Sequence, residues 1–162
     1  MKTIFFTFLA IFYVTTTISA ELKIDAYGKE DIFAYNVSES RKFFIWSSDA
    51  VWTTNIGITG SNTGRGSVEI INGETTSNIM SKWTEKNGDH FFAQFLVRSG
   101  SANDANIQVF KIISGNGRWE ELVGQKCLGA YIPVVDSKFM WQGKCEMSNK
   151  TKERLQNFSN KD

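Results

Sequence analysis

The sequence predicts an all-β protein, an antiparallel β-sandwich or jelly roll with a single domain. Short runs of apolar or alternating residues recur about every eight to twelve residues and are separated by Gly, Asn, Asp and Ser. No ten-residue stretch before the C-terminal tail shows helical periodicity. Aromatic residues make up 14 % of the chain, so a sizeable core can form and disorder across the domain is not expected.

The predicted strands share β-branched and aromatic residues in alternating or continuous apolar runs. They cover residues 21–26, 32–37, 42–46, 50–58, 67–71, 77–84, 90–98, 107–113, 127–135 and 138–146. Asn72-Gly73 is a tight-turn dipeptide, and 86–89 forms a second turn. Residues 118–123 suit either a strand or a single helical turn. The single proline, Pro133, is expected at an edge or a bend.

The first twenty residues have the pattern of a secretory signal peptide. Lys2 gives a short basic start, an almost unbroken apolar run follows, and small residues lead to Ala20. The apolar run is too short to cross a bilayer. We therefore expect a signal peptide at 1–20, a β-sandwich domain at 21–147, and a polar tail at 148–162 that is frayed, disordered or glycosylated. This predicts a secreted, extracellular protein with no transmembrane segment in the mature chain.

An exported chain with two cysteines predicts one disulfide, between Cys127 and Cys145. The cysteine spacing matches neither a CxxC redox pair nor a zinc knuckle, so a catalytic or metal-binding role has no support. Three Asn-x-Ser/Thr sequons, at Asn36, Asn149 and Asn157, are candidate glycosylation sites. Asn36 lies within a predicted strand, whereas the other two lie in the polar tail.

Charge and motif content argue against several classes of function. Removing Lys2 from the 18 basic residues leaves as many basic as acidic residues, 17 of each, so no net charge directs the protein to nucleic acid or to an anionic membrane. His90 is the only histidine, and its neighbour Asp89 would point to the opposite face of a strand, so no Ser-His-Asp triad is predicted. The glycine turn at 115–117 lacks the third glycine of a dinucleotide loop. We expect no enzyme activity, no cofactor and no metal.

Tryptophan supplies the candidate binding surface, because a pyranose ring stacks on an indole plane. Most of the five tryptophans are expected in the core, but Trp119 follows a glycine turn and is expected at the rim, beside Arg118. Trp52 lies among Thr and Asn. Arg65 lies in a Gly-rich segment that could grip an acidic ligand, unless the segment is a plain hairpin connection. The candidate ligand-binding residues are therefore Trp52, Arg65, Arg118 and Trp119.

Two segments resemble the farnesoic acid O-methyltransferase-like domain, a β-sandwich module of arthropod secreted proteins. Residues 42–50 are similar to a strand of that family that ends in Asp-Ala, and residues 67–79 are similar to its later aromatic-Glu-Ile stretch with the Gly and the polar run that follow. The resemblance covers 42–141 and implies a sandwich-type binding module. It carries over no catalytic residue, and no S-adenosylmethionine-binding βαβ loop accompanies it.

Together these features favour a non-enzymatic binding protein that recognises an extracellular ligand, such as a glycan or a component of a microbial surface. An alternative is a carrier of a lipid or another hydrophobic ligand, because Phe-rich strands with apolar residues on both faces can line a cavity. A hydrolase with a dispersed site is the third hypothesis. It requires two carboxylates in one cleft, or His90 within reach of a hydroxyl nucleophile.

Overall fold

A computed structural model describes residues 19–95, 98–99 and 107–158 of the chain. Within these residues it contains nine strands, a 3-10 helix and an α-helix. The elements are β1 (Ser19–Ser38), β2 (Arg41–Thr54), β3 (Thr59–Ile71), β4 (Glu74–Glu85), β5 (His90–Phe95), β6 (Arg98–Ser99), β7 (Ile107–Gly115), η2 (Gly117–Leu122), β8 (Lys126–Pro133), β9 (Lys138–Ser148) and α1 (Asn149–Gln156).

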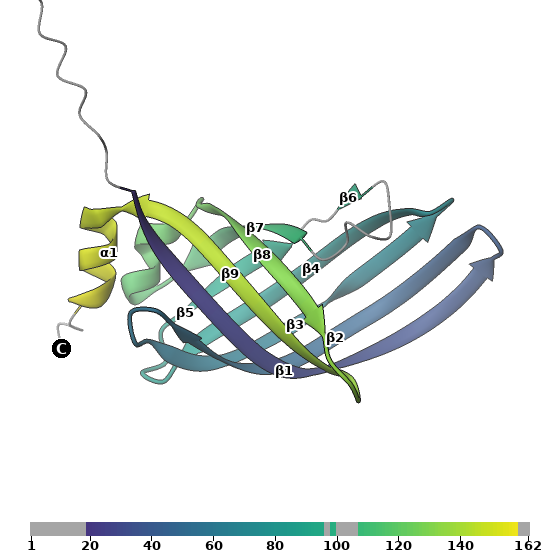
Figure 1. Ribbon diagram of the computed structural model, residues 1–162, viewed down its shortest axis with the longest axis horizontal. Helices are drawn as coiled ribbons and strands as arrows, with labels where there is room; N and C mark the ends of the chain where they lie inside the picture. The colour runs from purple at the N-terminus through teal and green to yellow at the C-terminus, as the bar shows by residue number, and fades with distance from the viewer. Residues whose placement is uncertain (1–18, 96–97, 100–106, 159–162) are drawn as a thin grey trace, which may run out of the picture.

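The strands form one antiparallel sheet that closes into a barrel (Figure 1). Their order is β3-β2-β1-β9-β8-β7-β5-β4-β6, and a further pairing between β3 and β4 completes the ring. The two-residue β6 pairs with β4, which leaves eight of the described strands in the barrel wall. The predicted sandwich or jelly roll is therefore wrong, because the described strands form a single sheet that closes on itself instead of two sheets packed face to face.

Long strands replace the short ones that the sequence predicts. β1 unites the predicted strands at 21–26 and 32–37, because the chain between them stays paired with β2 throughout and with β9 as far as Lys29. The apolar alternation breaks off there, since Gly28 and Glu30 occupy inward-facing positions. Ser48 interrupts β2 in the same way. The sequence pattern therefore predicts strand ends where small and polar residues face the barrel interior, although the strands continue through them.

β3 includes the Gly-rich segment that the sequence assigns to a loop. Gly64 and Gly66 lie in register with both β2 and β4. A Cβ on Gly66 would lie 2.3 Å from the backbone oxygen of Asn78, so only glycine permits this approach of the two strands. The glycines thus mark the place where the barrel closes.

Local predictions at two connections are confirmed. Asn72 and Gly73 form the tight turn between β3 and β4 with φ values of 51° and 85°. Positive φ at both central residues is the requirement of a type I′ hairpin turn. The segment at 118–123 takes the helical alternative, as η2.

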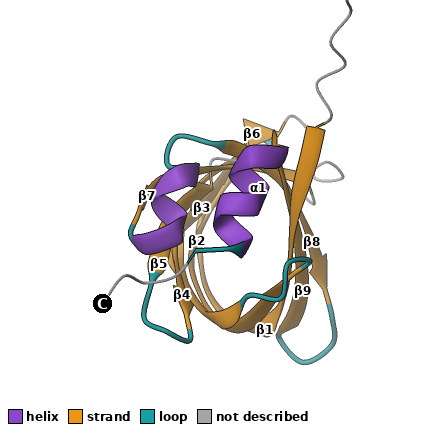
Figure 2. Cartoon of the chain, turned by 90° about the vertical axis from the view of Figure 1, so that its left-hand side faces the viewer, coloured by secondary structure: helices purple, strands orange, loops and turns teal. Residues whose placement is uncertain are grey.

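One end of the barrel is covered by η2 and α1 (Figure 2). Trp119 and Leu122 of η2 and Leu155 of α1 are buried beneath them. The predicted disulfide between Cys127 and Cys145 is confirmed, and it links β8 to β9. The covered end is therefore filled by apolar side chains.

The C-terminal tail is not frayed as expected over 149–156, where it forms α1. The side chain of Ser148 accepts a hydrogen bond of 3.1 Å from the backbone N–H of Thr151, which caps the helix. Leu155 then anchors the helix in the core. No helix among the described residues has both the length and the apolarity to cross a bilayer.

The predicted signal peptide lies outside the described residues except at its end. Ser19 and Ala20 begin β1, where they pair with Ser148 and Met147 of β9.

Candidate functional site: a cavity inside the barrel

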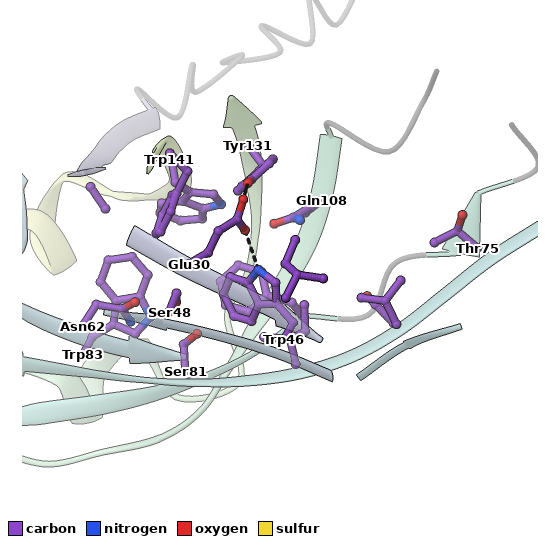
Figure 3. A pocket seen from close by; sticks show the side chains of 17 residues that line it. Glu30, Trp46, Ser48, Asn62, Thr75, Ser81, Trp83, Gln108, Tyr131 and Trp141 are labelled. Carbon is purple, nitrogen blue, oxygen red and sulfur yellow. Dashed lines mark hydrogen bonds between the residues drawn. The ribbon is translucent and has the colours of Figure 1, made fainter. Parts of the chain in front are cut away.

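The barrel holds a cavity of about 260 Å³ (Figure 3). Its described lining residues are inward-facing side chains of the wall, and none of them belongs to η2 or α1. The described lining residues are mainly aromatic, aliphatic and small, with a few polar groups. The aromatic ones are Trp46, Trp83, Phe95, Tyr131, Phe139 and Trp141, and the polar ones are Glu30, Ser48, Asn62, Thr75, Ser77, Ser81 and Gln108.

Glu30 is the one ionisable acid among the described residues that line the cavity. Its side chain is held by two donors from other strands. The indole Nε1 of Trp46 donates to Glu30 Oε2 at 2.6 Å, and the hydroxyl of Tyr131 donates to Glu30 Oε1 (Figure 3). The backbone N–H of Glu30 also donates to the carbonyl of Ser137 at 2.8 Å. These bonds fix the carboxylate at one place on the cavity wall.

Tyr131 is a hydrogen-bond donor to Glu30. Burial raises the pKa of the Tyr131 hydroxyl above its ordinary value, and the hydrogen bond to Glu30 and the negative charge of Glu30 raise it further. The tyrosine therefore keeps its proton at neutral pH. Because a carboxylate offers about four acceptor positions, Glu30 retains about two for a ligand after Trp46 and Tyr131 have bound.

Three polar groups of the cavity lining are buried without a hydrogen-bond partner among the described residues. They are the hydroxyl of Ser48 and the indole N–H groups of Trp83 and Trp141, whose residues are 2 %, 3 % and 4 % exposed. A buried polar group without a partner costs about 1–3 kcal/mol. A polar atom of a molecule inside the cavity would remove this cost.

Ser48 lies next to Glu30 and packs against Gly64. The two residues pair in the register of β1 and β2, so both face the interior. A Cβ built on Gly64 would lie 2.7 Å from the Trp46 ring, 2.8 Å from Ser48 Oγ and 2.9 Å from Ser81 Oγ. These three side chains therefore pack closely against Gly64, where even a methyl group would clash with them.

Aromatic contacts separate the cavity from the filled end of the barrel. The rings of Trp83 and Trp141 have centroids 5.2 Å apart, and Trp83 stacks on Phe91 at 5.6 Å. Trp141 also contacts Phe95 and Phe110 at 5.8 and 5.2 Å. Such mutual packing holds the indoles of the cavity wall in fixed orientations.

The structure does not gather the predicted ligand-binding residues on one exposed surface. Trp119, expected at the rim, is fully buried, because it packs against Trp52 with a centroid distance of 5.7 Å. Trp52 is 3 % exposed and donates its indole N–H to the carbonyl of Ser61. Arg65 donates to the carbonyl of Ser48 and lies 3.5 Å from the Asp49 carboxylate, with its side chain 60 % exposed. A ligand-binding role for these residues stays a prediction.

Arg118 joins the covering helices to the barrel. Its Nε lies 3.2 Å from Glu85 of β4, and its Nη1 donates to the carbonyl of Leu155 in α1 at 2.6 Å. Its guanidinium also lies 5.5 Å from the centroid of the Phe158 ring. Burial raises the pKa of Glu85, while the positive charge of Arg118 opposes that increase. These contacts give Arg118 a structural position at the covered end.

The three sequon asparagines are exposed, at the end of β1 for Asn36, at the start of α1 for Asn149 and just after α1 for Asn157. The Ser159 that completes the third sequon lies outside the described residues. Glycosylation of these sites stays a prediction.

The conditions set for a hydrolase are not met in the cavity. Its described lining has one carboxylate, whereas the hypothesis requires two, and His90 lies at the start of β5, where it contacts Phe92 edge-on. Among the described residues no three His, Cys, Asp or Glu side chains are grouped to hold a metal. The absence of enzyme activity stays a prediction.

The sequence analysis did not single out Glu30, Tyr131 or Ser48. A signal for Glu30 was present, because it shares the inward phase of β1 with Ala26 and Ile32, where a charged residue is unexpected. Tyr131 could not be identified, since β8 comes within reach of β1 only because β9 pairs with both strands.

No protein-family model matches the sequence, and no curated protein matches it, which leaves the resemblance to the farnesoic acid O-methyltransferase-like domain untested. Solved structures that share the fold include the following two. One, described as an enzyme from Penicillium herquei, has a TM-score of 0.60 and 8 % identity, over 78 % of this chain and 94 % of that one. The other, a beta-barrel like protein from Acinetobacter baumannii AYE, has a TM-score of 0.60 and 9 % identity, over 80 % and 96 % of the two chains. At these identities the similarity shows the fold alone, and it agrees with a barrel instead of the predicted sandwich.

Proposed function

We propose that the protein binds a small, largely apolar molecule inside the barrel and acts as its carrier or sequestering protein. The observation that carries this proposal is the cavity of about 260 Å³ with an aromatic lining and a fixed polar group, Glu30. An apolar cavity of about 150 Å³ already holds benzene. The larger volume here suits a bicyclic aromatic molecule or a ligand of similar size.

The residues inside the barrel support this proposal. An eight-stranded barrel is just wide enough for its side chains to fill it or for one small ligand. At the covered end large residues such as Trp52 and Phe91 fill the space, whereas the small residues Ala26, Ser48 and Ser81 line the cavity. This division leaves room for a ligand at one end only of the described barrel.

A neutral fluorescent probe, N-phenyl-1-naphthylamine, tests the proposal, because its emission rises in apolar surroundings. We expect saturable binding of one probe per chain. Ser81→Leu places added volume on the cavity wall and should weaken binding about tenfold or more. The control Thr76→Leu adds a similar volume to an exposed position on the same strand and should bind as the wild type does. Absence of saturable binding, or equal binding by folded Ser81→Leu, would overturn the proposal.

We also propose that the chain is exported, as the basic-apolar-small pattern of residues 1–20 predicts. The disulfide between Cys127 and Cys145 is compatible with an oxidising compartment. Mass spectrometry of the protein from its native source tests this. A mature chain that begins at Glu21 is expected, and a retained leader would contradict the proposal. The predicted glycan ligand has weaker support, because its candidate residues form no exposed aromatic surface.

A further inference from the structure

The carboxyl group of Glu30 lies in a largely apolar cavity and has no cationic partner among the described lining residues. Burying an ionised carboxylate is costly unless a charge of opposite sign accompanies it. The two groups that donate to Glu30, from Trp46 and Tyr131, are neutral. The described residues that line the cavity include no lysine, arginine or histidine. The described wall therefore supplies hydrogen bonds to this carboxylate but no counter-ion.

The surroundings of Glu30 suit a positively charged group. The faces of tryptophan and tyrosine rings attract cations, and the cavity lining includes Trp46, Trp83, Trp141 and Tyr131. Ser48 is the register partner of Glu30. Its buried hydroxyl has no hydrogen-bond partner among the described residues, and it can accept a hydrogen bond from a ligand. An alkylammonium group carries three N–H donors and no acceptor. It could thus donate to the open positions of Glu30 and to Ser48 while it rests against the Trp46 ring.

We infer that the ligand of this cavity is an organic cation, an amine with an aromatic body whose ammonium group pairs with Glu30. This inference rests on the proposed binding function and assigns its ligand class. The ammonium group lies on the cavity side of Glu30, Ser48 and the Trp46 ring. The aromatic body lies against the indoles of Trp83 and Trp141.

Other ligand charges fit this wall less well. A carboxylate ligand would bring a second negative charge next to Glu30 in a cavity of low polarity. A neutral ligand with a carbonyl group could pair with the N–H groups of Trp83 and Trp141, but it would leave Glu30 without a counter-ion. An amine supplies the counter-ion for Glu30 and hydrogen-bond donors for Glu30 and the Ser48 hydroxyl.

Three indole compounds with different head groups test the inference by isothermal titration calorimetry at neutral pH. Tryptamine carries an ammonium group, indole-3-ethanol a neutral hydroxyl and indole-3-acetate a carboxylate. We expect tryptamine to bind about tenfold tighter than indole-3-ethanol or better, because hydrogen bonds between charged groups are the stronger ones, and indole-3-acetate to bind weakest. Equal or weaker binding of tryptamine would overturn the inference.

Two matched variants test whether the charge of Glu30 causes the preference for tryptamine. Glu30→Gln should remove the advantage of tryptamine over indole-3-ethanol, whereas Asp31→Asn removes a charge from the next, outward-facing residue and should leave that advantage intact. Binding of N-phenyl-1-naphthylamine shows whether each variant keeps its cavity. If Glu30→Gln loses that binding, Ser48→Ala takes its place and should lower tryptamine affinity selectively. A tryptamine advantage that survives in a folded Glu30→Gln variant would refute the role of Glu30.

The same measurements separate this inference from the binding proposal. If neither the neutral probe nor any of the indoles binds, the proposed function itself fails. If the neutral probe and indole-3-ethanol bind but tryptamine has no advantage, the binding function stands and the amine assignment is wrong.

Discussion

Replacing Arg118 by methionine should strongly destabilise the covered end of the barrel. The change keeps most of the side-chain length but removes the ion pair with Glu85 at 3.2 Å and the hydrogen bond to the carbonyl of Leu155 at 2.6 Å. The side chains of Arg118 and Glu85 are 14 % and 11 % exposed, so the pair is largely shielded from water. Breaking a buried pair by removing one partner costs about 3–5 kcal/mol.

Because both side chains keep some exposure to water, we expect a loss of stability near the lower limit of this range, at about 3 kcal/mol. For a domain of this size each 1 kcal/mol lowers the melting temperature by roughly 2–4 °C, so Arg118→Met should melt roughly 10 °C below the wild type. Thermal unfolding followed by circular dichroism measures the difference. Arg154→Met is the matched control, because its pair with Glu121 at 2.9 Å is exposed and should contribute about 1 kcal/mol or less.

The loss should also depend on pH through Glu85. Burial raises the pKa of Glu85 in the folded protein, so the folded state holds this proton more tightly than the unfolded chain. The unpaired carboxylate therefore destabilises the variant as the pH rises through the range in which Glu85 ionises. At lower pH, where Glu85 is protonated in both states, this part of the cost vanishes and the loss of the hydrogen bond to Leu155 remains. A deficit equal to that of Arg154→Met, or one that does not shrink towards about pH 4, would refute this reasoning.

Three further predictions concern other parts of the barrel. Replacing both Cys127 and Cys145 by alanine opens a loop with a sequence separation of 18 and should cost about 3 kcal/mol, measured by urea unfolding; unchanged stability would contradict it. Gly64→Ala should weaken binding of N-phenyl-1-naphthylamine, because the new methyl group would lie 2.7 Å from the Trp46 ring. Equal probe affinity of the Gly64→Ala variant would show that the Trp46 ring beside Gly64 is not part of the site. Expression in a eukaryotic secretory host should attach a glycan at the exposed Asn149, and Asn149→Gln should lower the mass by one glycan; an unchanged mass would count against the predicted modification.

Local chemistry was predictable from the sequence where it depends on neighbouring residues. Asn72-Gly73 specified its turn because few other dipeptides adopt positive φ twice in succession. The pairing of Cys127 with Cys145 followed from the even number of cysteines in a chain with a predicted signal peptide. The all-β class was evident from the alternation of apolar residues.

Sheet closure and the cavity depend on distant contacts, and for this reason the sequence did not reveal them. Whether a set of strands folds into two sheets or one barrel is decided by which edges pair, here β3 with β4 and β1 with β9. Gly28 and Glu30 interrupt the apolar pattern and so predict a break between two strands, although both residues continue β1. The hydrophobic alternation breaks at these residues because the strand there lines the cavity, where Glu30 faces inward. Trp119 was misplaced for a related reason, since a turn of η2 directs it into the core.

A crystal structure of the protein with N-phenyl-1-naphthylamine would test the binding cavity most directly. We predict density for one probe molecule inside the barrel, in contact with Trp83 and Trp141 and within reach of Glu30. A barrel interior that stays closed to the probe, with the molecule bound on the outer surface or not at all, would contradict an internal binding site.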